Sequence, residues 1–254
     1  MFGTMGFWRE IRNRPEQYYI VHYSSEGLYD EDSVGISPKI TSIVVMHFAT
    51  RQAISFTVHA IAEEMNIEKT KIFDRYNEIE LKIIEKFYEF VRDRRANKWI
   101  HWNMRNITFG FEHIEHRYRV LCSREPPVLP VEQRVNLNDA LIERYGYKYA
   151  PDPRMKNLMS LNGSVPVGFL DGREEAAAFK RGDFIRMHNS TLSKVGFFNF
   201  VIKSVLHGKL NTSGKTAGAW LDRALESRTS KVVTLASGVI GVPGALAFIF
   251  SLLR

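Results

Sequence analysis

The sequence predicts an α/β protein in which a mixed β-sheet is flanked by helices. Three apolar, strand-like segments come first, and amphipathic helical segments then alternate with short strands. The 254 residues are 44% hydrophobic and 12% aromatic, so the chain has enough apolar side chains for a large buried core. Sequential strands followed by alternating helices and strands are typical of a sheet with both antiparallel and parallel pairs.

Aromatic and β-branched residues mark the first three strands. YYIVHYS (18–24) is separated from the second strand, ITSIVVMHF (40–48), by a loop rich in Gly, Asp, Ser and Pro. The third strand is expected over AISFTVHAI (53–61), and TRQ before it is short enough for a hairpin turn. A long amphipathic helix is expected over 69–95, because its apolar residues recur every three or four positions.

The segment KWIHWNMRNITFGFEHIEHRY (98–118) predicts a strand-to-helix corner. Trp99–Trp102 forms the fourth strand, the chain breaks at Asn103, and a helix follows. Trp, His and Asn side chains gather at this corner. It is therefore a candidate ligand site, although Trp and Tyr at such a corner more often belong to a packed core.

The second half of the chain is predicted to be mainly helical. VNLNDALIERYG (135–146) begins as a short strand and continues as a helix capped by Asn138 or Asp139. Further helices are expected over 153–163 and 173–209.

The formal net charge of +7 weakly favours binding to an anionic partner, either nucleic acid or a membrane surface. The alternative is a soluble protein that is basic without such a partner. Cys122 is the single cysteine, which excludes an intrachain disulfide and a metal site built from several cysteines.

The C-terminal region has the composition of a membrane span. Val232–Leu253 contains no charged residue, and as a helix it would be roughly 33 Å long at about 1.5 Å per residue, close to the ~30 Å hydrocarbon core of a bilayer. We therefore predict a folded domain over 1–202, a basic juxtamembrane linker over 203–230 and a single C-terminal transmembrane helix over 231–254. Lys and Arg in the linker predict that the bulk of the chain is cytoplasmic. The alternative is a buried core helix or an apolar contact between subunits.

Small residues recur every four positions within this span, at Ser237, Gly241 and Ala245. Such a stripe lets membrane helices approach closely, so we predict helix packing there and a homo-oligomer as one kind of partner.

Three stretches carry a resemblance to a known family: IVHYSSEGL (20–28), IHWNMRNITFGF (100–111) and MHNSTLSKV (187–195). Together with the order of the elements, they resemble the DEDD 3′–5′ exonucleases, which have an RNase H-like fold, over residues 17–201. In that family a first strand ends in Asp-x-Glu, a second strand end precedes an Asp that opens a helix, and a later helix carries His and then Asp. The places that resemble these motif positions are Ser24, Glu26, Asn106, His188 and one of Leu192, Ser193 and Lys194.

The resemblance implies a site for two divalent metals held by four carboxylates, which activate a water molecule and stabilise the leaving oxygen. Hard cations such as Mg²⁺ require anionic oxygen ligands. Ser24 and Asn106 are uncharged, and none of the three candidates for the last Asp is acidic. We therefore expect a degenerate member of the family with no metal or cofactor; Mg²⁺ or Mn²⁺ is expected only if the chain is an active nuclease.

Basic and aromatic side chains near the corner suit phosphate contact and base stacking, although an ordinary charged helix end has the same composition. The residues that we predict to contact nucleic acid are Arg94, Arg95, Lys98, Trp102, Asn103 and Arg105. Two acidic patterns are weaker metal candidates. EHIEH (112–116) lacks the His spacing of a metalloprotease helix, so a solvated helix face is expected, and Asp30–Asp32 is expected to be a solvated loop.

The predicted function is a membrane-tethered, catalytically degenerate exonuclease-like module that binds nucleic acid or a partner protein. A cytoplasmic sensing domain joined to a small-residue membrane helix is similar in architecture to bacterial anti-phage defence effectors, so a defence-system protein is a further partner class. One alternative is an active metal-dependent 3′–5′ exonuclease anchored to the membrane, with Glu26, Asp30–Asp32 and His188 regrouped into its site. The other is a membrane scaffold that binds only protein.

Overall fold

The computed structural model describes residues 4–27, 37–105 and 108–215, and every structural statement below concerns these residues. Among them, no helix is both long and apolar enough to cross a membrane. The predicted span, the stripe Ser237, Gly241 and Ala245 within it, and most of the predicted linker lie outside the described residues.

A five-stranded mixed sheet forms the centre of the fold, as the sequence predicts. Its spatial order is β3-β2-β1-β4-β5. The pairs β1–β2 and β2–β3 are antiparallel, and β1–β4 and β4–β5 are parallel. The strands are β1 Tyr18–Ser25, β2 Ile40–His47, β3 Ala53–Thr57, β4 Lys98–His101 and β5 Arg134–Asn136. Because β1, β4 and β5 run in the same direction, their carboxyl ends meet at one edge of the sheet.

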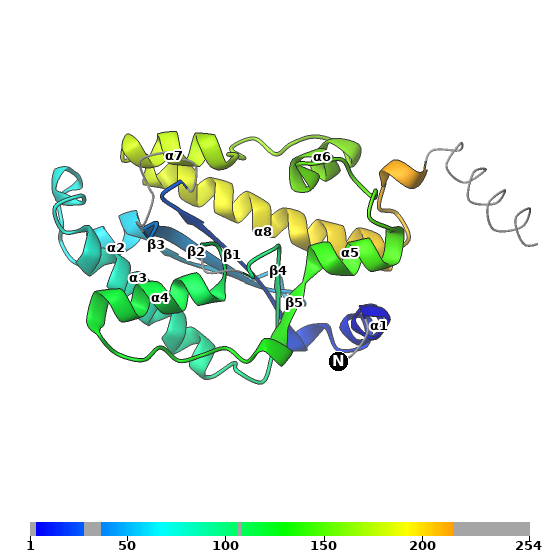
Figure 1. Ribbon diagram of the computed structural model, residues 1–254, viewed down its shortest axis with the longest axis horizontal. Helices are drawn as coiled ribbons and strands as arrows, with labels where there is room; N and C mark the ends of the chain where they lie inside the picture. The colour runs from blue at the N-terminus through cyan, green and yellow to red at the C-terminus, as the bar shows by residue number, and fades with distance from the viewer. Residues whose placement is uncertain (1–3, 28–36, 106–107, 216–254) are drawn as a thin grey trace, which may run out of the picture.

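Helices cover both faces of the sheet (Figure 1). In the described part of the chain the α-helices are α1 Thr4–Asn13, α2 Val58–Glu64, α3 Tyr76–Arg92, α4 Phe111–Cys122, α5 Leu137–Tyr145, α6 Arg154–Leu161, α7 Gly172–Lys180 and α8 Phe184–Leu206. The short 3₁₀ turns are η1 Pro15–Gln17, η3 Lys69–Lys71, η4 Val131–Gln133 and η5 Ser213–Lys215. The longest helix, α8, contacts both β1 and β2.

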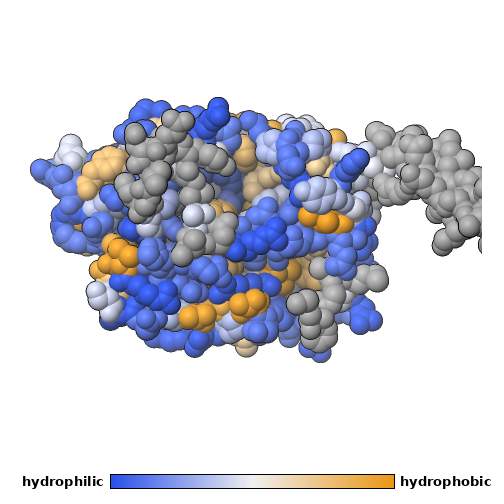
Figure 2. Space-filling view, in the orientation of Figure 1, coloured by the Kyte–Doolittle hydropathy of each residue, from blue (hydrophilic) through white to orange (hydrophobic). Residues whose placement is uncertain are grey.

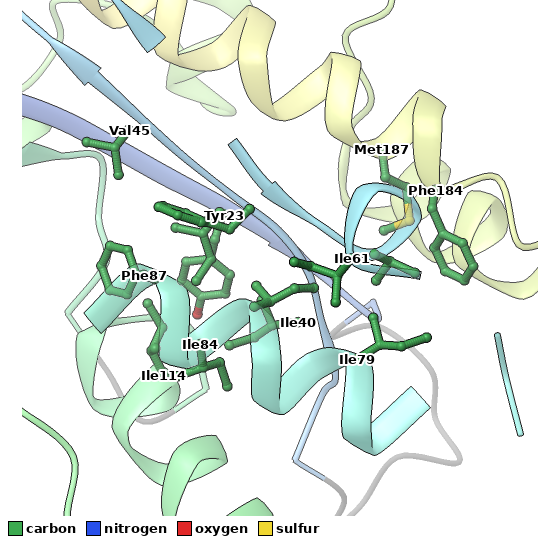
Figure 3. Packing of buried hydrophobic residues seen from close by; sticks show 14 of the residues in the cluster. Tyr23, Ile40, Val45, Ile61, Ile79, Ile84, Phe87, Ile114, Phe184 and Met187 are labelled. Carbon is green, nitrogen blue, oxygen red and sulfur yellow. The ribbon is translucent and has the colours of Figure 1, made fainter. Parts of the chain in front are cut away.

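Side chains alternate along β1 between two hydrophobic clusters, as expected of a strand buried on both faces. Val21 and Tyr23 belong to the cluster with α2, α3 and α4, and Figure 3 shows Tyr23 with α3 residues of that cluster. Ile20 belongs to the second cluster, with α1, α5 and most of α8. On the face in Figure 2, hydrophobic residues form scattered patches on a mainly hydrophilic surface, since most large apolar side chains lie inside.

Three element boundaries differ from the prediction. The third strand ends at Thr57, because the Thr57 side chain accepts a hydrogen bond from the Ala60 backbone N–H and begins α2. The predicted helix over 69–95 is a 3₁₀ turn followed by α3, which ends at Arg92. The cap of α5 is Asn136, not Asn138 or Asp139, and its side chain accepts from the Asn138 backbone N–H.

The folded domain also extends beyond residue 202. Helix α8 continues to Leu206, and the side chain of Leu210 is fully buried in the second cluster. The Ser213 N–H donates to the Tyr149 carbonyl oxygen at 2.9 Å. The start of the linker at 203 is therefore wrong, because the residues that follow complete the core.

Candidate functional site

A cavity of about 350 Å³ opens at the sheet edge where β1 and β4 end. Helices α6, α7 and α8 and the segments that follow β4, α5 and α6 complete its walls. The lining residues are His22, Ser25, Gly27, Trp102, Asn103, Phe109, Pro153, Met155, Lys156, Phe169, Leu170, Asp171, Gly172, Glu175 and Lys194. Carboxyl ends of parallel strands are the usual place for a ligand site in α/β folds, so this cavity is the best candidate in the described chain.

A buried polar network centres on the carboxylate of Glu175, on α7. Its Oε1 accepts hydrogen bonds from Lys194 Nζ at 2.6 Å and from Ser24 Oγ at 3.0 Å. Ser24 Oγ also lies 2.5 Å from Thr191 Oγ1, which in turn lies 2.8 Å from Ser42 Oγ. The network therefore joins β1, β2, α7 and α8 beside the cavity.

The cation of this network is Lys194. Its side chain is 7% exposed and that of Glu175 is 13% exposed, so the ion pair is largely shielded from solvent. Lys194 Nζ also lies 5.2 Å from the centre of the Phe169 ring, a cation–π contact. Buried charges require partners of this kind, and here each charged group has one.

A buried histidine lines the cavity next to this pair. His22 precedes Ser24 by two positions on β1, so both side chains point to the α8 face of the sheet. The His22 ring makes edge contacts with Phe109 and Phe198, with centroid distances of 5.7 and 5.5 Å. Burial, and then the charge of Lys194, hold the pKa of His22 well below its usual value, so the imidazole is neutral.

Aromatic side chains form much of the remaining wall. Trp102 stacks on Phe198 with a centroid distance of 5.6 Å, and Phe109 stacks on Tyr23 at 4.6 Å. Trp102 is placed by the break after β4, where Asn103 adopts a left-handed φ of 54°. The Asn103 N–H donates to Asn136 Oδ1 at 3.1 Å, which ties this corner to the end of β5.

Close packing places α7 and its glutamate against the end of β1. A Cβ atom on Gly27 would collide with the Cβ of Ala176, so only glycine permits this approach. The helix begins with a capping box in which Asp171 accepts from the Glu174 N–H and Glu174 accepts from the Asp171 N–H. One turn of rigid helix therefore fixes the direction of Glu175.

The donor set does not fit the two divalent metals that the resemblance implies. Among the described side chains that hydrogen-bond Ser24, only Glu175 is a carboxylate, and the ammonium of Lys194 already neutralises it at 2.6 Å. The nearby hydroxyls of Ser24, Thr191 and Ser42 hydrogen-bond one another. A dication would have to displace a buried lysine, and the remaining oxygen ligands would not balance its charge.

The structure brings some of the predicted site residues together. Ser24 lies in the network, and Trp102 and Asn103 line the cavity. His188 does not join them: its Nε2 lies 2.9 Å from Ser55 Oγ on β3, and its ring contacts His59. Glu26 is half-buried at the end of β1, where its N–H donates to the Lys39 carbonyl oxygen at 2.8 Å.

Of the other predicted positions, one is described and does not line the cavity. Ser193 is half-buried on α8 and is absent from the cavity lining, whereas its neighbour Lys194 lies there. Asn106 lies outside the described residues, as does the acidic loop Asp30–Asp32.

The predicted nucleic-acid residues do not form one surface. Arg94, Arg95 and Lys98 lie where α3 ends and β4 begins, and Trp102 and Asn103 follow its other end. Arg95 and Lys98 donate to the carbonyl oxygens of Val128 and Glu132 at 2.8 Å. Arg94 Nε donates to the Tyr19 hydroxyl at 3.2 Å. These three cations therefore hold a Pro-rich connection and a helix end in place.

Arg105 and the EHIEH segment also make structural contacts. Arg105 pairs with Asp139 at 2.6 Å. Glu112 and Glu115 both pair with Arg134. His113 is buried, and its Nε2 lies 2.9 Å from the Pro38 carbonyl oxygen. The expectation that this segment is a solvated helix face is therefore wrong for His113, which faces the core.

Three residues of the site, His22, Glu175 and Lys194, were not chosen from the sequence. Glu175 lies in an ordinary acidic helix start, REEAAAF, and only the fold brings it to the end of β1. Lys194 appeared only as a non-acidic residue in the place of an expected Asp. Lys194 lies one helical turn after Ser190 and Thr191, two buried residues with hydroxyl groups. This spacing places the three side chains on one face of the helix and could have indicated a polar site.

Comparison with protein-family models, with curated proteins and with solved structures gave no match for this chain.

Proposed function

We propose that this chain is an RNase H-like, exonuclease-related module that binds single-stranded nucleic acid at the cavity without cutting it. The strand order, with β1 central and β2 antiparallel to it, supports the RNase H-like assignment. The observation that supports the loss of cutting is the Lys194–Glu175 pair: a buried protein cation already neutralises the one carboxylate that hydrogen-bonds Ser24, the position that resembles a metal-binding Asp of the DEDD exonucleases.

The aromatic walls support nucleic acid as the ligand. The cavity at the sheet edge is lined by three aromatic rings on which a base can stack, those of Trp102, Phe109 and Phe169. Stacking on aromatic rings tolerates any base. Unpaired bases are accessible to such rings, whereas bases within a duplex are not, so single strands are the expected form.

The membrane tether and the oligomer are part of the same proposal. They rest on the uncharged segment Val232–Leu253 and its small-residue stripe. The tether would hold the binding module at the cytoplasmic face, where a defence-system protein is a candidate partner. Carbonate extraction of membranes tests this part: the full chain should stay in the pellet and a chain ending at 230 should not.

The deciding experiment measures binding and cleavage together. The full chain in detergent is mixed with labelled single- and double-stranded DNA and RNA, with and without Mn²⁺. We expect single strands to bind and to remain intact under both conditions. Phe169→Leu should weaken binding, whereas Phe200→Leu, the same change at a 44%-exposed phenylalanine of α8 that does not line the cavity, should not.

Each alternative gives a different result in these tubes. Metal-dependent cleavage would show an active nuclease and overturn the proposal. No binding to any strand would leave a membrane scaffold that recognises only protein. Equal loss of binding in the two phenylalanine variants would place the interface elsewhere.

A further inference from the structure

The imidazole of His22 is a buried polar group whose hydrogen-bonding capacity the fold does not use. Neither ring nitrogen has a hydrogen-bond partner among the described residues: Nδ1 is shielded from solvent, whereas Nε2 keeps access to it. The residue is only 4% exposed, yet it lines the cavity. Buried polar atoms without a partner are costly, and few proteins keep them without a reason.

The surroundings of His22 hold the ring in a fixed orientation. Phe109 and Phe198 contact it with interplanar angles of 65° and 83°, so each packs edge against face with the imidazole. Lys194 and His101 are the other titratable groups that bear on it, and both disfavour its protonation. A neutral imidazole has one donor nitrogen and one acceptor nitrogen.

The charges that line the cavity cancel within it. Lys194 pairs with Glu175 at 2.6 Å, and Lys156 pairs with Asp171 at 3.3 Å. These are the four acidic and basic side chains among the lining residues, two of each sign. A phosphate inside the cavity would meet both carboxylates as well as both cations, so the cavity favours an uncharged group.

From these observations we propose that the cavity binds an uncharged planar nitrogen heterocycle, such as a nucleobase, and that His22 hydrogen-bonds it through Nε2, the accessible ring nitrogen. The ring would lie among Trp102, Phe109 and Phe169, with its edge toward the imidazole. The inference deepens the proposed nucleic-acid binding, because the heterocycle can come from a free nucleoside or from an unpaired base of a strand. It adds that the cavity recognises the base and that the phosphate stays outside the cavity.

The test titrates the full chain in detergent with adenosine, guanosine, cytidine and uridine, with the corresponding 5′-monophosphates, and with single-stranded oligonucleotides. Calorimetry gives the affinities. We expect at least one nucleoside to bind, and its monophosphate to bind no more tightly. His22→Phe keeps a ring of similar shape without hydrogen-bonding atoms, and it should weaken that nucleoside about tenfold or more.

A spectroscopic readout separates a direct contact from a structural effect. In protein labelled with ¹⁵N-histidine, the ring nitrogen signals of His22 should move on addition of the nucleoside. Those of His47, whose ring contacts Thr50 and the Glu16 carbonyl oxygen outside the cavity, should not. His47→Phe is the matched control for affinity, and Phe109→Leu is a second cavity variant should His22→Phe fail to fold.

Four outcomes decide the matter. Nucleoside binding that both cavity variants weaken supports the inference. Nucleoside binding that His22→Phe leaves unchanged overturns the role of His22. Binding of oligonucleotides without any nucleoside overturns the base-recognition inference but leaves the proposed function standing. No binding by either class overturns both.

Discussion

Lys194 of α8 donates a hydrogen bond to Glu175 of α7 at 2.6 Å, in a position where both side chains are largely buried. The pair joins two helices beside the end of β1, and Ser24 Oγ donates to the same carboxylate oxygen. A buried ion pair contributes little net stability to the fold. Removing one member is costly, because the remaining charge stays buried without its partner.

Removing the cation alone should therefore destabilise the protein. We expect Lys194→Met to lower the free energy of unfolding by about 3 kcal/mol, and Lys194→Met with Glu175→Gln to recover part of that loss. Urea unfolding followed by circular dichroism measures both.

The control for this prediction is Lys156→Met. Lys156 pairs with Asp171 on the same wall of the cavity, but their side chains are 44% and 42% exposed. Its loss should cost less than about 1 kcal/mol. Equal costs for the two lysine variants would contradict the assignment of Lys194–Glu175 as a buried pair.

Substitution by alanine is expected to have opposite effects on stability at Gly27 and at Gly196. A Cβ on Gly27 collides with Ala176, so Gly27→Ala should push α7 away from β1 and cost about 1–3 kcal/mol. A Cβ on Gly196 meets nothing within 4 Å, and this glycine lies inside α8, so Gly196→Ala should stabilise the protein by about 0.5–1 kcal/mol. Thermal unfolding of the two variants provides the comparison, and stabilisation by both would refute the close contact.

The fold was largely predictable because its strands and helices have strong local patterns. β1 and β2 were located to within a residue or so, since runs of β-branched and aromatic residues rarely occur outside strands. The third strand was predicted too long because VHAI suits both states, and only the Thr57 cap decides for a helix. Helix α1 was not predicted, although Phe7, Trp8 and Ile11 have helical spacing and are buried.

The candidate site was predictable only in part. Ser24, Trp102 and Asn103 stand at strand ends, which a sequence pattern can locate. Glu175 lies 151 positions after Ser24, and no local pattern links the two. The basic and aromatic residues were grouped because they are close in sequence. Lys98 begins β4 and Trp102 follows its end, so the group is divided between the two ends of that strand.

A second buried ion pair lies away from the cavity, and removing its cation is expected to cause a large loss of stability. Arg117 of α4 donates from two nitrogens to the carboxylate of Glu80 on α3, whose side chain is fully buried. Glu80 also accepts from the Ile40 N–H at 2.9 Å. Arg117→Met would leave a buried carboxylate with the Ile40 N–H as its only hydrogen-bond partner among the described residues, and should cost about 3–5 kcal/mol in urea unfolding.

Arg119→Met is the matched control for this pair. Arg119 lies on the same helix and pairs with Glu125, but its side chain is 43% exposed and that of Glu125 is 82% exposed. A loss below about 1 kcal/mol is expected there. If Arg117→Met cost no more than this control, the carboxylate of Glu80 would have to be neutral or hydrated in the variant.

The buried histidines predict that acid destabilises the protein before its carboxylates titrate. Burial, followed by the charges of Arg134 and Arg105, lowers the pKa of His101 from its usual 6.5 to about 3. Between these two values the unfolded chain binds a proton that the folded chain does not, so stability is full above 6.5 and falls as the pH drops below it. The slope is about 1.4 kcal/mol per pH unit for each such histidine, and His22 adds to it with the same sign.

His101→Asn isolates this contribution. His101 Nδ1 accepts from the Met104 N–H at 3.1 Å, and an asparagine Oδ1 can accept the same bond without titrating. The variant should be less stable than the parent at pH 8, and the difference should shrink by about 1 kcal/mol or more between pH 6.5 and 5.5. Urea unfolding at pH 8, 6.5 and 5.5 measures this difference, with pH 8 as the reference. A difference that stays constant over this range would mean that His101 takes up its proton equally in the folded and unfolded states, which would contradict the lowered pKa.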